Sequence, residues 1–172
     1  MTVSRRISFE YAADPDRVAA LVLDPGFLRD RSAAAGDREI DIQLDEVDGG
    51  FRLTIARQRT IDLPHFVKGW VEPTHWATEK TYWRRQGKRW VAEFAVEVQG
   101  MPGRASGRSF LEPSSAGCRY ESTFEVTAKV PVPFLGSRIE TLLADGLAEQ
   151  LLFNAARNAA ALASGSEPTQ RM

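Results

Sequence analysis

The side chains best suited to metal binding and nucleophilic catalysis are few in this sequence. His65 and His75 are the only histidines, and Cys118 is the only cysteine. A zinc site needs three or four ligands with compatible spacing, and only scattered carboxylates could supplement the two histidines. We therefore expect no metal site and no other cofactor.

Recognisable catalytic motifs are missing as well. The sequence contains no G-x-S-x-G nucleophile elbow, no phosphate-binding glycine loop and no dinucleotide-binding fingerprint. Cys118 begins a predicted strand on its buried side, where a thiol without a basic neighbour behaves as a small hydrophobic residue. His65, in the segment "LPHFVK", is either a lone acid or base at a cavity mouth or, as is commoner, a partly exposed packing residue.

Two arginines continue an apolar alternation. Phe51, Leu53 and Ile55 alternate with polar residues, and the same period places Arg57 and Arg59 on the inward face. A buried guanidinium is costly unless it meets an anion or other hydrogen-bond acceptors. Either the strand bends out of the sheet at this point, or the arginines point into a wet cavity mouth and hold the polar head-group of a ligand.

Aromatic residues are abundant for a chain of this size. They include Trp70, Trp76, Trp83, Trp90, Phe66, Phe94, Tyr82 and Tyr120. Such side chains either fill a core or line a cavity for an apolar ligand. The sequence alone leaves both possibilities open.

Composition indicates an ordinary soluble globular protein. The 172 residues are 43% hydrophobic and carry a formal net charge of -1, so nucleic-acid binding, which needs a basic excess, is not expected. No apolar run approaches the roughly 20 residues of a membrane span, and no signal peptide is apparent. We expect a cytoplasmic protein with no integral membrane segment. It should have one domain over residues 1–163 and a flexible tail over 164–172.

Hydrophobic periodicity predicts about seven antiparallel strands and three helices. A strand over "RRISFEY" is followed by two short helices, for which Asp14 and Asp24 are the expected N-caps because each precedes a proline. Alternating segments separated by turns then predict a meander of six strands, the third of which starts with "ATEKTYW" at Ala77. Pro131 and Pro133 end the last of these strands.

A long helix follows, predicted over residues 137–163. Its start, "SRIE", has the pattern of a capping box between Ser137 and Glu140. We expect the face with Ile139, Leu143 and Gly146 to point inward. Glycine is unfavourable inside a helix, so Gly146 is expected to make room for a ligand or for an aromatic ring such as Phe94 or Tyr120. Gln150, Asn154 and Arg157 continue this stripe as possible neighbours of the arginines.

This order of elements resembles the helix-grip fold of the START-related (SRPBCC, birch-pollen-allergen-like) superfamily. Three segments, "FEYAADPDRVAALVLDPGFLRDR", "RTIDLPHFVKGW" and "VPVPFLGSRIE", are most similar to a bacterial family of unknown function. The resemblance implies an α+β fold in which a curved antiparallel seven-stranded sheet wraps the C-terminal helix and encloses an apolar cavity. Members of the superfamily include lipid carriers, hormone receptors, polyketide cyclases and chaperone activators.

The resulting functional hypothesis is a non-catalytic carrier or sensor of a hydrophobic small molecule, such as a lipid, sterol or polyketide. The predicted ligand-binding residues are Arg57, Arg59, Phe66, Trp70, Tyr82, Trp90, Phe94, Tyr120, Phe124, Leu143, Gly146 and Gln150. One rival is a cyclase-type enzyme in which Tyr82, His65 or Arg57 moves protons. Another is a protein-interaction module that uses the helix surface formed by Ala148, Leu152, Ala155 and Ala159.

Overall fold

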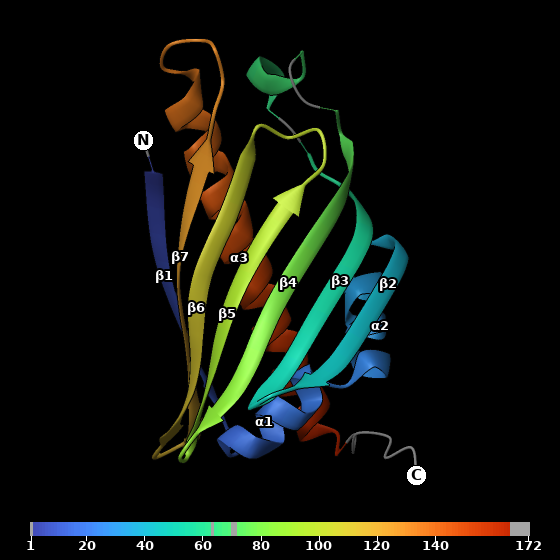
Figure 1. Ribbon diagram of the computed structural model, residues 1–172, viewed down its shortest axis with the longest axis vertical. Helices are drawn as coiled ribbons and strands as arrows, with labels where there is room; N and C mark the ends of the chain where they lie inside the picture. The colour runs from blue at the N-terminus through green and yellow to red at the C-terminus, as the bar shows by residue number, and fades with distance from the viewer. Residues whose placement is uncertain (1, 63, 70–71, 166–172) are drawn as a thin grey trace.

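The computed structural model describes residues 2–62, 64–69 and 72–165 (Figure 1). The strands are β1 (Thr2–Tyr11), β2 (Arg38–Val47), β3 (Gly50–Thr60), β4 (Thr74–Gln86), β5 (Arg89–Val98), β6 (Gly103–Ser114) and β7 (Gly117–Ala128). The helices are α1 (Pro15–Val22), α2 (Pro25–Ala34) and α3 (Leu135–Ala163), with a short 3₁₀ turn η1 (His65–Val67). Ser164 caps α3, and the rest of the predicted tail, 166–172, lies outside the described residues.

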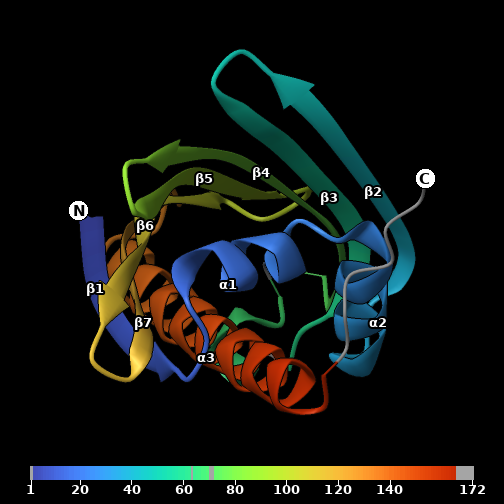
Figure 2. The same cartoon turned by 90° about the horizontal axis from the view of Figure 1, so that it is seen from below.

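All seven strands form one antiparallel sheet in the order β1-β7-β6-β5-β4-β3-β2. Strands β2 to β7 form a meander. Strand β1, which precedes them in the chain, pairs with β7 along its whole length. The sheet curves around α3, as the view from below shows (Figure 2). The predicted helix-grip fold is therefore confirmed. None of the described helices is long and apolar enough to cross a membrane.

The two short helices begin where the sequence predicts. The Asp14 carboxylate accepts a hydrogen bond from the Arg17 amide, and the Asp24 carboxylate accepts from the amides of Gly26 and Phe27. Helix α1 lies across the lower opening between the sheet and α3 (Figure 2), while α2 packs on β2. Both helices thereby close the lower part of the sheet's concave side.

The start of α3 differs from the prediction. The helix begins at Leu135, after Phe134 in a left-handed conformation (φ 66°), and the Ser137 hydroxyl donates to the Phe134 carbonyl. Glu140 does not reach back to Ser137. Its Oε1 accepts a hydrogen bond of 2.9 Å from the buried amide of Ala128, at the end of β7. The predicted capping box is therefore wrong, because the Glu140 carboxylate instead joins the helix to the sheet.

The inward face of α3 is also rotated from the predicted one. Ile139 is buried as expected, but the other buried residues are Glu140, Ala144, Ala155 and Asn158. Gly146 is exposed, and a Cβ built on it would meet no atom within 4 Å, so it makes no room for Phe94 or Tyr120. The rotation arises because the polar groups of Glu140 and Asn158 find hydrogen-bond partners inside the protein.

Helix α3 lies nearest to β1 and β7, at one side of the sheet. Its apolar side chains pack on inward residues of β7 such as Phe124 and Val126. The backbone of α3 makes fewer contacts with the middle strands β3 to β6 than with β1 and β7. This arrangement places a space between α3 and the middle of the sheet.

Candidate functional site

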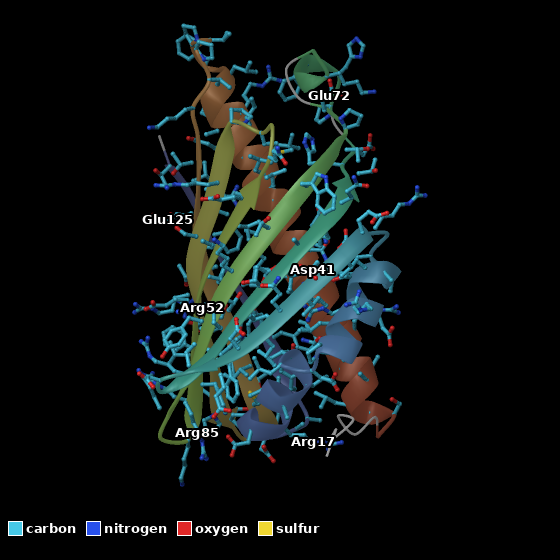
Figure 3. The ribbon with its side chains drawn as sticks, turned by 45° about the vertical axis from the view of Figure 1, so that its right-hand side comes forward. Arg17, Asp41, Arg52, Glu72, Arg85 and Glu125 are labelled. Atoms are coloured by element: carbon cyan, nitrogen blue, oxygen red, sulfur yellow. The ribbon has the colours of Figure 1, made fainter. Side chains whose placement is uncertain are left out.

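A pocket of about 480 Å³ occupies this space. It lies between the first half of α3 and the upper ends of β3 to β7, and it is partly open to solvent. Its volume is within the range of roughly 300–1,000 Å³ typical of small-molecule sites. Outward-facing side chains such as Arg52 and Glu125 point away from it, on the other face of the sheet (Figure 3).

One wall of the pocket is apolar. It consists of Val96, Val98, Ala105 and Val126 from the sheet and Leu142 and Leu143 from α3. The strand residues share the inward face because side chains alternate along each strand. This wall can hold the apolar body of a ligand.

The opposite wall is polar and is formed mainly by the ends of β3 and β4. Arg57 and Arg59 face inward from β3, as the alternation predicts, and His75 faces inward from β4 directly across from Arg59. Gln150 completes this wall from α3 and donates a hydrogen bond of 3.0 Å to Asn154. The pocket is therefore amphipathic.

Both arginines are paired with acidic residues of the protein. Arg59 donates from Nε and Nη2 to the two oxygens of Asp37, each over 2.7 Å. Arg57 Nε lies 3.2 Å from Asp37, and its Nη2 lies 3.4 Å from Glu79. Two guanidinium charges thus face two carboxylates, so this wall has little uncompensated positive charge.

Asp37 is the residue that sequence reasoning missed here. It follows the end of α2, and its amide donates to the Ser32 carbonyl. Its side chain is fully buried (0% exposed), between the two arginines. No local pattern marks Asp37, because its partners lie about twenty positions away on another element.

His75 was also missed as a pocket residue. It is 3% exposed, and its Nδ1 lies 3.3 Å from the carbonyl oxygen of Gln99. The prediction began this strand at Ala77, whereas β4 begins at Thr74. The inward alternation of Ala77, Glu79 and Thr81 extends back to position 75 and could have found it.

A smaller cavity of about 80 Å³ adjoins the pocket on its lower side. Phe94 and Tyr120 line it, whereas Phe124 is buried in the packing between β7 and α3. The two spaces share Val96 and Leu147 as lining residues. The predicted ligand-binding residues Arg57, Arg59, Leu143, Gly146 and Gln150 instead line the larger pocket.

Hydrogen-bonded polar groups line the smaller cavity. Arg31 donates to Asn158, which donates to the Tyr11 hydroxyl, and Thr81 donates to Glu79. Burial lowers the pKa of Arg31 and raises the pKa of Tyr11. Burial likewise raises the pKa of Tyr120. The smaller cavity is therefore bordered by two hydrogen-bonded polar groups, one around Asn158 and one around Glu79.

The other predicted residues lie away from the pocket. Tyr82 faces outward and donates to the Asp48 carbonyl, and Trp90 lies at the lower end, where its ring nitrogen donates to Asp16. Phe66, on η1, is 37% exposed and contacts the Arg138 guanidinium. Trp70 lies outside the described residues. The alternation places Tyr82 on the convex face, and Trp90 packs near α1.

Of the three residues named for a cyclase-type enzyme, only Arg57 lines the pocket. His65 is exposed on η1, and Tyr82 faces outward, so neither can act on a molecule in the pocket. Of the proposed interaction surface on α3, Ala155 is buried and Ala148 and Ala159 pack against the core, which leaves only Leu152 exposed.

Outside the pocket, several charged side chains form ion pairs with one another. Among the described residues, no group of three His, Cys, Asp or Glu side chains could hold a metal ion. In the hairpin between β4 and β5, Arg85 (Figure 3) forms an ion pair with Asp16 of α1, and Arg89 forms one with Glu112.

Solved structures with low sequence identity share the fold. Protein SA2116 from Staphylococcus aureus, of unknown function, is 10% identical, with 96% of each chain covered and a TM-score of 0.63. Ara h 8.0201 is 13% identical, with 95% of this chain and 99% of that chain covered and a TM-score of 0.56. Both likenesses concern the fold alone, and they show that the helix-grip arrangement of this chain occurs in other proteins.

A structure of norcoclaurine synthase from Thalictrum flavum with dopamine and hydroxybenzaldehyde is 15% identical. The alignment covers 97% of this chain and 90% of that chain, with a TM-score of 0.56.

A comparison with curated proteins gave no match. A family model described as "Protein of unknown function (DUF2505)" matches residues 6–159. The chain therefore belongs to this family of proteins of unknown function, within the helix-grip fold.

Proposed function

We propose that the protein binds or carries a hydrophobic small molecule in the pocket between α3 and the sheet, without covalent catalysis. The observation that carries this proposal is the amphipathic pocket of about 480 Å³, whose apolar wall stands opposite the polar ends of β3 and β4. A lipid, sterol or polyketide-like molecule has the corresponding apolar body and polar end.

The polar end of this ligand is uncharged. Asp37 and Glu79 already neutralise Arg57 and Arg59, so an acidic head-group would meet the two carboxylates as well as the two guanidiniums. Burying a further charge without its own partner is unfavourable. A neutral hydrogen-bonding group avoids that cost, and the side chain of Gln150 borders the same wall.

One of the compared structures supports a small-molecule ligand. Norcoclaurine synthase, which shares the fold, is recorded in complex with dopamine and hydroxybenzaldehyde, two small aromatic molecules with polar groups. The family itself has no assigned function. The proposal therefore depends mainly on the pocket's own residues.

Native mass spectrometry of freshly purified protein tests the proposal directly. We expect an additional species heavier than the chain by the mass of a small apolar molecule, which is lost at higher collision energy. Titration with the uncharged fluorescent probe N-phenylnaphthylamine should show saturable binding after that molecule is stripped. A protein that carries no such mass and does not bind the probe would contradict the proposal.

A further inference from the structure

His75 lines the pocket, and one of its two ring nitrogens is buried without a hydrogen-bond partner. His75 is nearly fully buried, and its Nε2 has no hydrogen-bond partner among the described residues. A buried polar atom that lacks a partner costs about 1–3 kcal/mol, so such atoms are rare in folded proteins. This atom needs a partner that the described chain does not supply.

The other ring nitrogen determines the chemistry of Nε2. Nδ1 lies 3.3 Å from the carbonyl oxygen of Gln99, which can only accept a hydrogen bond, so Nδ1 carries the proton. In the neutral ring Nε2 is then unprotonated and is an acceptor. It requires an O–H or N–H donor.

The two arginines nearest to His75 donate to carboxylates and not to its Nε2. Arg59, directly across from His75 in the register, uses Nε and Nη2 on Asp37, and Arg57 is held between Asp37 and Glu79. The remaining neighbours of His75 along the inner face include Ala77 and, on β5, Val98, which have no side-chain donor. Because His75 lines the pocket, a ligand bound there is a further source of a donor.

We propose that His75 Nε2 accepts a hydrogen bond from a hydroxyl group of the ligand, so that the pocket selects alcohols or phenols over the same skeleton without a donor. This inference rests on the proposed function and adds to it the chemical class of the ligand's polar end. The apolar wall holds the body of the molecule, while the hydroxyl group reaches the end of β4. His75 thus acts as a specificity residue.

Binding of naphthol and of its methyl ether, methoxynaphthalene, tests this inference at neutral pH. Both compounds have the same ring system and an oxygen acceptor, but only naphthol can donate. We expect wild-type protein to bind naphthol roughly five- to tenfold more tightly than methoxynaphthalene, because the net free energy of one hydrogen bond corresponds to about that ratio of affinities. His75→Phe keeps a ring but removes the acceptor and should bind both compounds equally.

Two further variants make the comparison specific. His75→Gln can place an amide oxygen near the position of Nε2, so part of the preference for naphthol should return. His65→Phe changes the other histidine, which is exposed on η1, and should leave the preference unchanged. A preference that survives in His75→Phe would overturn the assignment, and so would its loss in His65→Phe.

Nitrogen NMR of the His75 ring gives a readout that does not depend on a variant folding. We expect naphthol to shift the Nε2 resonance and methoxynaphthalene to leave it nearly unchanged. Equal shifts with both compounds would overturn the inference while leaving the proposed function intact. If neither compound nor N-phenylnaphthylamine bound to wild-type protein, the proposed function would fail as well.

Discussion

Arg59 and Asp37 form a two-point ion pair, with both hydrogen bonds 2.7 Å long and the Asp37 side chain fully buried. The parallel contacts between guanidinium and carboxylate are the strong form of a charge-assisted hydrogen bond. Because Asp37 also faces Arg57 Nε, one carboxylate holds two arginines at the polar wall of the pocket. Asp37 therefore controls both the stability and the charge of the site.

We expect Asp37→Asn to lower the free energy of unfolding by about 3 kcal/mol. Removing one partner of a buried ion pair leaves an uncompensated charge, which is strongly destabilising. Urea unfolding followed by circular dichroism measures the change. Asp45→Asn makes the same substitution at an exposed position of β2 and should change stability little. A loss of similar size in both variants would show that the pair is not responsible.

The same substitution should change which ligands the pocket prefers. Asp37→Asn removes a negative charge beside Arg57 and Arg59, so the two arginines keep positive charge that an anion in the pocket can compensate. We expect affinity for anilinonaphthalene sulfonate to rise relative to uncharged N-phenylnaphthylamine, by roughly tenfold, or about 1.4 kcal/mol. Fluorescence titrations of both probes measure the ratio. An unchanged ratio would mean that the carboxylate does not set the charge of the polar wall.

A large side chain at position 146 is expected to block the pocket at its rim. It lines the pocket from α3, and a side chain there meets open space. We expect Gly146→Trp to fold and to weaken binding of N-phenylnaphthylamine by at least tenfold, or about 1.4 kcal/mol. Gly146→Ala should keep binding and gain up to about 1 kcal/mol of stability, because alanine favours a helix interior.

A matched substitution separates blocking of the pocket from a general effect of tryptophan. Ala156 is exposed on α3 and lines neither cavity. Ala156→Trp should therefore bind the probe as wild type does. Equal binding by Gly146→Trp and Ala156→Trp would show that the probe does not enter the space beside Gly146.

The sheet could be predicted from the sequence because strand alternation has a strict period of two. That period places Arg57 and Arg59 inward without any knowledge of the rest of the fold, and the caps at Asp14 and Asp24 define two helices locally. The same alternation, extended back along β4, predicts that His75 faces inward. Only the predicted start of β4 kept it out of the candidate site.

The orientation of α3 could not be predicted in the same way. Its apolar residues are spread around the helix, so two polar residues decide which side faces inward. Glu140 bonds to the Ala128 amide and Asn158 to Tyr11. The second pair lies 147 positions apart in the sequence. Asp37 presents the same difficulty, since only the assembled fold brings it to the arginines of β3.

Cys118 gives a prediction for alkaline pH. The thiol is fully buried, and burial, with the nearby carboxylates of Glu10, Asp14 and Glu112, raises the pKa of Cys118 to about 12. An unfolded chain loses this proton near its ordinary pKa of about 8.5, so unfolding releases a proton between these values. The thiol's contribution to stability is therefore fully present below about pH 8.5 and is lost as the pH rises toward 12.

Between pH 7 and pH 10 we expect the free energy of unfolding of wild-type protein to fall by about 2 kcal/mol more than that of Cys118→Ala. Burial also raises the pKa values of Tyr11 and Tyr120, and because burial is the largest cause for each, their alkaline loss is nearly the same in both proteins and largely cancels in the comparison. Urea titrations at several pH values measure the two slopes. Native protein should also react slowly with a thiol reagent at pH 8, because the thiol becomes accessible only on opening. Parallel pH profiles for the two proteins, or rapid reaction of the native thiol, would show that Cys118 is not held neutral in the core.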